Sequence, residues 1–323
     1  MGELFRVFHC YRSLLSMQAL VIRSTGTTYT VLRDDGTIVE AHIKGNMRLK
    51  GIRTTNPVAV GDRVEVAEQT DGTYWLTRIE PRRNYIIRRA TNLSKEAHIL
   101  AANIDQTALI VTLHHPITST VFIDRFLATA EAYSVPAILI FNKIDLLSEE
   151  ETEQLLSLRR LYESLGYPTI ALSALQPATR DVLLPLLSDK TTLLSGNSGV
   201  GKSTLLNTIF GKQLTRTGDV SAAHDKGMHT TTFSEMYALP SGGWLIDTPG
   251  IKGFGSVEMQ KEEVSHYFRE IFAIGRNCRF GNCLHTGEPG CAVVKAVENG
   301  QIALSRFDSY LSLLGDTDEN KYR

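Results

Sequence analysis

Cysteine and tryptophan are scarce in this chain, which has four Cys and two Trp among 323 residues. A small secreted domain held together by disulfides is therefore excluded. No apolar run approaches the ~20 residues that a membrane-spanning helix needs, so we expect no membrane partner. An excess of charge of one sign is also lacking, because 34 Lys and Arg nearly balance 35 Asp and Glu. That balance excludes a histone-like polycation and a disordered acidic protein.

The N-terminus lacks the features of a secretory signal. Arg6 and Arg12 interrupt its apolar residues, and no cleavage site of small residues follows them. We therefore expect a cytoplasmic protein. A regular pattern begins only at Met17, so we set residues 1–16 apart as an N-terminal extension, either a loose segment or a mis-assigned start.

The near-neutral total hides an uneven distribution of charge. Residues 1–98 contain 15 Lys and Arg against 10 Asp and Glu, whereas residues 99–250 contain 10 against 15. A basic N-terminal third suggests an anionic partner, and an ordinary solvated surface is the alternative interpretation.

Residues 17–96 have the alternating pattern of a small antiparallel barrel. Short alternating stretches are separated by turn signals such as Asp35-Gly36. The stretch Val58–Val64 resembles the turn into a strand of OB-type barrels, which often bind nucleic acid on their strand face. A basic connector with Arg82-Arg83 and Arg88-Arg89 follows, and its charge fits the anionic partner suggested for this third of the chain.

Strands and helices alternate over residues 97–255, which predicts a mostly parallel sheet flanked by helices. Residues 256–323 are mainly helical around a cluster of cysteines, so the chain reads as a multidomain α/β protein with three domains. The predicted strands of the central domain are Ala108–Leu113, Ala137–Phe141, Pro168–Ala171, Thr191–Leu194 and Leu245–Ile246, and its predicted helices are Phe122–Tyr133, Glu149–Leu165, Arg180–Leu187 and Lys202–Phe210.

A phosphate-binding loop lies between one of these strands and the next helix. The sequence Gly-Asn-Ser-Gly-Val-Gly-Lys-Ser at 196–203 has the P-loop pattern in the required context. Its glycines let backbone N–H groups point at phosphates, and the helix N-terminus adds the positive end of its dipole. Lys202 would reach the β- and γ-phosphates, and the Ser203 hydroxyl would ligate Mg²⁺. The predicted nucleotide-binding residues here are Ser195, Gly196, Asn197, Ser198, Gly199, Val200, Gly201, Lys202 and Ser203.

The sequence Asn-Lys-Ile-Asp at 142–145 follows an apolar strand and adds base specificity. Asp145 would accept hydrogen bonds from the guanine N1–H and amine, a donor pair that adenine lacks. This argues against a P-loop ATPase or kinase. Ser173-Ala174 fits a backbone contact to guanine O6. The predicted guanine-binding residues are therefore Asn142, Lys143, Ile144, Asp145, Ser173 and Ala174.

The sequence Asp-Thr-Pro-Gly at 247–250 ends another predicted strand. In sites of this class the aspartate holds Mg²⁺ and the glycine N–H meets the γ-phosphate. The polar loop before this strand offers a threonine for the Mg²⁺ sphere, for which Thr231 is preferred to Thr230. The predicted magnesium residues are Ser203, Thr231 and Asp247.

Three of the four cysteines lie close together near a histidine. Cys278, Cys283, His285 and Cys291 supply three thiolates and an imidazole, the donor set of a closed structural Zn²⁺ site. Four protein ligands leave no open position for water, so the predicted role is structural. The spacing is looser than that of paired Cys-x-x-Cys motifs, and coincidentally buried cysteines are the alternative.

The order of the GTPase motifs is circularly shifted, because residues 142–145 and Ser173-Ala174 precede the phosphate loop. With a barrel before it and a Cys/His module after it, this order resembles the RsgA family of circularly permuted GTPases that depend on the small ribosomal subunit. The resemblance covers residues from about 17 to 315 and includes the four zinc ligands. It implies subunit-stimulated GTP hydrolysis and a role in late small-subunit maturation.

Hydrolysis should be slow in the isolated protein, because Ile251 stands where a water-orienting glutamine would follow Gly250. The resemblance implies that His229 of the switch loop takes this role, and a merely polar loop residue is the alternative. The predicted catalytic residues are His229, Lys202 and Gly250.

The sequence thus predicts a Mg²⁺-dependent GTP hydrolase with one structural Zn²⁺ that acts as a monomer. Its partners would be GTP or GDP and the small ribosomal subunit with its rRNA. A nucleotide-gated RNA-binding module with incidental turnover is the alternative. Because the chain leaves the GTPase domain directly after Gly250, we expect the C-terminal module to respond to nucleotide state.

Overall fold

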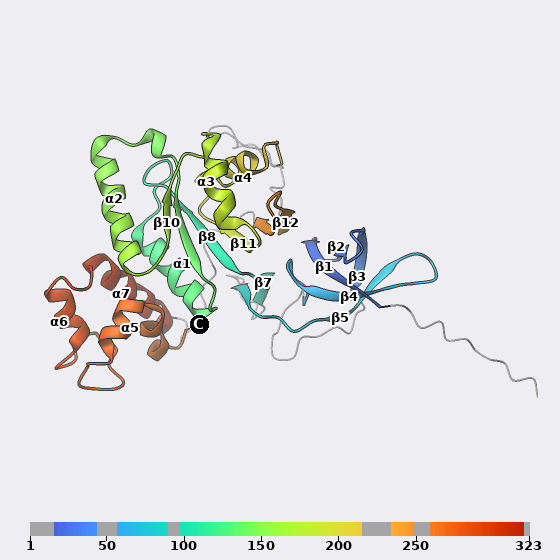
Figure 1. The fold of residues 1–323 in the computed structure, drawn as a ribbon. Helices are drawn as coiled ribbons and strands as arrows, with labels where there is room; N and C mark the ends of the chain where they lie inside the picture. Colours follow the sequence, from blue (N-terminus) through green and yellow to red (C-terminus); the bar gives the residue numbers. More distant parts are fainter. Residues whose placement is uncertain (1–15, 44–56, 90–96, 215–233, 248–258, 320–323) are drawn as a thin grey trace, which may run out of the picture.

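The computed structural model describes residues 16–43, 57–89, 97–214, 234–247 and 259–319 (Figure 1). Within these ranges the chain forms an N-terminal barrel, a central α/β domain and a C-terminal helical module. The predicted multidomain α/β architecture is therefore confirmed. A search of the described helices finds none with the length and apolar character needed to cross a membrane.

The barrel has five strands whose inward side chains form a core of its own. β1 pairs with both β2 and β4, and β5 pairs with both β3 and β4, so the sheet closes on itself. The alternating pattern of the sequence places Val21, Tyr29, Val31 and Val64 inside. The strands are β1 (Met17–Ser24), β2 (Thr28–Arg33), β3 (Ile38–Ile43), β4 (Arg63–Glu68) and β5 (Tyr74–Ile79).

The turn before β4 is held against the rest of the chain by close backbone contact and a buried ion pair. Gly61 has φ +90°, and a Cβ there would lie 2.1 Å from the carbonyl oxygen of Ala102, so only glycine fits. Arg82 donates from Nε and Nη2 to the two carboxylate oxygens of Asp62, both at 2.6 Å. The Arg82 side chain is only 7% exposed, so it stabilises this turn. The expectation that its charge is available to an anionic partner is therefore wrong.

A two-stranded hairpin, β6 (Tyr85–Arg89) with β7 (Ala97–Ala102), replaces the connector that the sequence suggested. Its Ile86 and Ala101 pack with Ile246 of the central domain in one shared core. The barrel also meets the central sheet directly, because Arg23 of β1 pairs with Glu235 of β12. The barrel and the central domain are therefore joined by both backbone pairing and apolar contact.

The central domain is a sheet in the order β10-β9-β8-β11-β13-β12, parallel except for β12. Every predicted strand and helix of this domain is present, whereas β12, a short antiparallel strand, was not predicted. Its strands are β8 (Gln106–Val111), β9 (Ala137–Phe141), β10 (Thr169–Ala171), β11 (Thr191–Ser195), β12 (Glu235–Ala238) and β13 (Trp244–Asp247).

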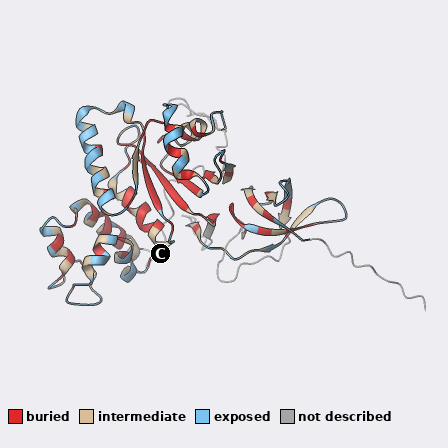
Figure 2. Cartoon of the chain, in the orientation of Figure 1, coloured by how far each residue is buried: buried red, intermediate tan, exposed pale blue. Residues whose placement is uncertain are grey.

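Helices cover both faces of this sheet, which explains why every residue of β8 and β9 is buried (Figure 2). One face packs against α1 (Thr120–Ala132) and α2 (Glu149–Ser164), and the other against α3 (Ala178–Leu187) and α4 (Lys202–Phe210). A 3-10 turn, η1 (Ile144–Leu146), follows β9. Two separate apolar layers thus fix the sheet from both sides.

The C-terminal module packs against α1 and contacts the end of α2 (Figure 1). Its core joins Phe268, Val293 and Tyr310 with Ala128 of α1. Its elements are η2 (Lys261–Tyr267), α5 (Arg269–Gly275), α6 (Ala292–Glu298) and α7 (Leu304–Glu319).

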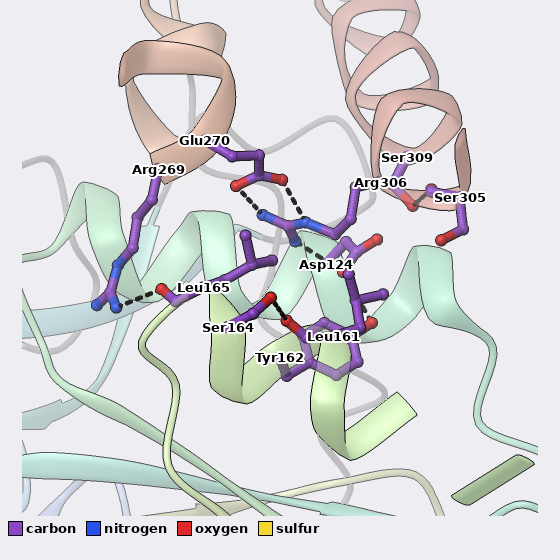
Figure 3. A network of polar contacts seen from close by, with 10 residues as sticks. All are labelled: Asp124, Leu161, Tyr162, Ser164, Leu165, Arg269, Glu270, Ser305, Arg306 and Ser309. Atoms are coloured by element: carbon purple, nitrogen blue, oxygen red, sulfur yellow. Dashed lines mark hydrogen bonds and ion pairs between the residues drawn. The ribbon is translucent and has the colours of Figure 1, made fainter. Parts of the chain in front are cut away.

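A buried ionic network fastens this module to the central domain (Figure 3). Arg306 of α7 is 1% exposed and donates to Asp124 of α1 at 2.7 Å and to Glu270 of α5 at 2.7 Å. The Tyr162 hydroxyl of α2 donates to the same Asp124 oxygen at 2.9 Å. The guanidinium also lies 4.7 Å from the centroid of the Phe268 ring. The network thus links α1, α2, α5 and α7 through one buried cation.

Replacing Arg306 with alanine is expected to lower the free energy of unfolding by about 3–5 kcal/mol, because Asp124 would stay buried without its cation. Urea unfolding measures this. The matched control is Arg125→Ala, which removes an exposed pair with Asp316 and should cost about 0–1 kcal/mol. Equal losses for the two variants would contradict the role assigned to the network.

Candidate functional site

The predicted nucleotide motifs meet at the carboxyl edge of the parallel strands. Leu194 near the end of β11 lies opposite Asp247 at the end of β13, and β8 separates β11 from β9. The loops after β9, β10 and β11 therefore open on the same edge, and β13 also ends there. Ligands of open α/β sheets bind at such an edge, beyond the ends of the strands.

The phosphate loop has the backbone shape that its glycines allow. Gly196, Gly199 and Gly201 have φ of 147°, 83° and 98°, and α4 begins directly afterwards at Lys202. A Cβ at Gly196 would lie 2.8 Å from the carbonyl oxygen of Ile110, so this loop also needs glycine to pack against β8. Backbone N–H groups of the loop and of the helix start can then face an anion.

Asn142 ties the phosphate loop to the guanine motifs. Its Nδ2 donates to the carbonyl of Val200 and its Oδ1 accepts from the amide of Ala174, each at 2.8 Å. The side chain is 3% exposed, and a Cβ at Gly201 would lie 2.4 Å from its Nδ2. One buried amide therefore sets the spacing between three motifs that lie far apart in the sequence.

Two further hydroxyls, which sequence reasoning missed, hold the loop of residues 173–174. Thr179 donates to the carbonyl of Ser173 and Thr208 of α4 donates to that of Ala174, each at 2.6 Å. No motif marks these threonines, because their role depends on α3 and α4 lying side by side. They make the base-binding loop part of the same rigid unit as the phosphate loop.

Asp145 lies in η1 with an exposed side chain, on the same edge of the sheet as the phosphate loop. The preceding Lys143 has φ 64° and donates from Nζ to the carbonyl of His115 in the loop after β8. This left-handed residue turns the chain sharply at the end of β9. A carboxylate so placed can accept hydrogen bonds from a base bound beyond the strand ends.

Lys202 and Asp247 bring opposite charges to the phosphate loop. Lys202 Nζ donates to the carbonyls of Gly196 at 2.7 Å and Asn197 at 2.8 Å. Burial lowers the pKa of the Lys202 ammonium, and the Asp247 carboxylate opposes this shift. The ammonium is thus held over the loop where a nucleotide phosphate would lie. His229, Thr230, Thr231 and Gly250 lie outside the described residues, so their roles stay predictions.

The second candidate site is the cluster of Cys278, Cys283, His285 and Cys291, whose ligand atoms all lie within 4.8 Å of one another. The sulfurs of Cys278 and Cys291 are 3.9 Å apart, and His285 Nδ1 lies 3.6 Å and 3.4 Å from them. A tetrahedron with bonds of ~2.0–2.3 Å to nitrogen and sulfur has edges of ~3.4–3.8 Å, so the donors fit Zn²⁺.

The surrounding chain supports this donor set. The amide of Ala292 donates to Cys278 Sγ at 3.3 Å, and that of Val294 donates to Cys291 Sγ at 3.4 Å. Such N–H groups stabilise thiolates. Burial raises the pKa of the Cys283 thiol to about 12 and lowers the pKa of His285. A bound cation would favour the Cys283 thiolate and the neutral imidazole.

The fold and the site define a circularly permuted P-loop GTPase, since the motifs that follow β9 and β10, which are predicted to bind the base, precede the phosphate loop in the chain. Residues 79–257 match the family model described as RsgA GTPase, and residues 18–75 match that of the RsgA N-terminal domain. The chain belongs to the RsgA GTPase family. The resemblance inferred from motif order is therefore confirmed.

Known relatives cover almost the whole chain. It is 57% identical to the "Small ribosomal subunit biogenesis GTPase RsgA" of Phocaeicola vulgatus and 56% identical to that of Bacteroides fragilis, each over 95% of this chain and 99% of the relative. The crystal structure of YjeQ from Thermotoga maritima superposes with a TM-score of 0.72 at 31% identity, covering 94% of this chain and 99% of that one. YloQ, described as a circularly permuted GTPase, gives 0.71 at 28% identity, covering 99% and 100%.

Proposed function

We propose that this protein hydrolyses GTP in a Mg²⁺-dependent reaction that the small ribosomal subunit stimulates, and that it acts in the late maturation of that subunit. The observation that carries the proposal is the pair of hydrogen bonds by which Asn142 joins the phosphate loop to the loop of Ala174. This contact supports the proposal, because it joins the loop proposed to cradle the phosphates to the strand end that precedes Asp145, the residue proposed to read guanine. Relatives named for small-subunit biogenesis support the choice of partner.

The chain's own groups divide the work of binding between phosphates and base. Residues 195–203 surround the phosphates with backbone N–H groups, and Lys202 adds a positive charge. Asp145 and the Ser173-Ala174 loop select guanine. Ser203, Asp247 and Thr231 would hold Mg²⁺, which, when bound, neutralises negative charge on the β- and γ-phosphates.

Water positioning is assigned to His229, because Ile251 has no group that can orient water. We expect His229→Ala to abolish most of the subunit-stimulated turnover while leaving GTP affinity within about twofold, since the histidine acts on the attacking water and not on the base or phosphates. Steady-state hydrolysis with saturating small subunits measures this. An unchanged stimulated rate would remove His229 from the catalytic residues.

The proposed surface for rRNA is the basic N-terminal barrel and the segment that follows it. Arg82 is not part of this surface, because it is paired with Asp62. Arg83 stays 61% exposed although it pairs with Asp105, and exposed pairs of this kind exchange readily for phosphate. Zn²⁺ would stabilise the fold of the C-terminal module, which packs against the central domain. Within this proposal the protein is a cytoplasmic monomer.

The deciding experiment compares GTP and ATP hydrolysis with and without purified small ribosomal subunits. Stimulation of GTP hydrolysis alone supports the proposal. Nucleotide-dependent binding to subunits without stimulation would instead favour a nucleotide-gated RNA-binding module. A preference for ATP would overturn both.

A further inference from the structure

A groove of about 350 Å³ lies on the C-terminal module, between the end of α5 and the loop that carries the cysteine ligands. Two large aromatic side chains beside it are exposed, Phe272 by 37% and Phe280 by 43%. Exposed apolar surface at a groove is typical of a ligand-binding or interaction site. The groove is lined by Glu262, His266, Phe272, Arg276, Phe280 and Asn282, among others.

An arginine guanidinium lies over each of the two exposed rings. The guanidinium carbon of Arg276 lies 4.8 Å from the centroid of Phe272, and that of Arg279 lies 5.4 Å from the centroid of Phe280. His266 meets Phe272 edge to face at 4.9 Å. These pairs present flat cationic and aromatic surfaces next to each other, the combination on which nucleobases stack and beside which phosphates are bound.

The cysteine cluster holds the groove in place. Phe280 lies between the ligands Cys278 and Cys283, and its carbonyl accepts from the amide of Cys283 at 3.3 Å. On the other side, α5 lies close to the cluster, because a Cβ at Gly275 would lie 3.2 Å from the His285 ring. Bases bind best to surfaces that need no reordering, and this groove is fixed from both sides.

We propose that this groove binds an unpaired nucleobase of single-stranded RNA, which stacks on Phe272 and Phe280 while Arg276 and Arg279 contact the neighbouring phosphates. Asn282 offers an amide for the base edge, and the Glu262 carboxylate at the rim can accept from an exocyclic amine. The source of the RNA, the small ribosomal subunit, rests on the proposed function. The groove itself stands on the geometry of the C-terminal module.

The test uses the full-length, zinc-loaded protein and a fluorescein-labelled adenosine RNA octamer, with an abasic octamer of the same charge for comparison. The variant Phe272→Leu/Phe280→Leu keeps apolar volume and removes the stacking faces. We expect wild type to prefer the adenosine octamer and the double variant to bind it at least about fivefold more weakly. Leu304→Ala is the control, because Leu304 is 63% exposed on α7 and lies outside the groove.

Unchanged zinc content and melting temperature show that the double variant is folded. Equal affinity of wild type and double variant for the adenosine octamer would overturn the proposal. Weaker binding to small subunits with unchanged octamer binding would also overturn it, in favour of a protein partner at the groove. If subunits do not stimulate wild-type GTP hydrolysis, the proposed function fails, whereas the octamer experiment still decides the groove.

Discussion

Replacing Asp145 with asparagine is expected to change the preferred nucleotide from GTP to xanthosine triphosphate. Aspartate accepts two hydrogen bonds, from the guanine N1–H and amine, whereas asparagine offers one acceptor and one donor. Xanthine has a carbonyl in place of the amine, so it matches asparagine. Because mismatched polar groups at such a site stay unpaired, we expect the GTP preference over xanthosine triphosphate to fall by about 10⁴-fold.

Competition binding with the two triphosphates measures this change. Asp181→Asn is the matched control. Asp181 is an exposed acid on α3, so its substitution removes the same charge outside the site. It should leave the preference for GTP intact. Retention of GTP specificity by Asp145→Asn would show that another group reads the base.

Removal of zinc is expected to unfold the loop that joins α5 to α6. The four donors lie in a segment with little apolar core of its own, so metal binding supplies its folding energy, ~10 kcal/mol or more for structural zinc. A strong chelator should therefore lower the melting temperature and expose the thiols to a colorimetric reagent. Cys283→Ser should lower zinc content and melting temperature without chelator.

The remaining cysteine provides the control for this experiment. Cys10 lies in residues 1–16, outside the four predicted zinc ligands, so we expect Cys10→Ser to bind one zinc per chain like the wild type. Purified protein without zinc, or a melting curve that the chelator leaves unchanged, would contradict a structural zinc site.

The sequence predicts most of the motifs at the carboxyl edge of the sheet, because each motif is a short run of neighbouring residues. A strand followed by a glycine-rich loop and a helix start needs only neighbouring residues, so the phosphate loop at 196–203 and the element α4 lie where expected. Asp145 and Asp247 were likewise found from the strands that they end. Motif order was enough to predict the circular permutation, and together with the barrel before it and the Cys/His module after it, the family.

Contacts between distant segments were not predictable in the same way. The pattern of Arg82-Arg83 indicated a basic connector, but the tertiary fold buries Arg82 against Asp62. The strand pairing of β6 with β7 depends on residues brought together by the barrel and the central sheet. Charge in a sequence therefore does not show whether a side chain faces a partner or a buried carboxylate.

The position of the C-terminal module shows the same limit. Its departure from the GTPase domain directly after Gly250 predicts a link to nucleotide state, and the structure adds an anchor on α1 and α2 through Arg306 and Asp124. No spacing relates these two residues, which are 182 positions apart. A buried guanidinium is thus one of the contacts that join the C-terminal module to a helix near the start of the central domain.

What the sequence by itself determined is the set of motifs and their permuted order: a P-loop, a carboxylate predicted to read guanine, and four side chains that could hold a metal ion. Each depends on residue type and short spacing, which the chain contains directly. Only the tertiary structure decided which charges are buried, how Asn142 joins the motifs and where exposed rings meet a groove. Those features depend on packing between distant segments, whose geometry no local pattern encodes.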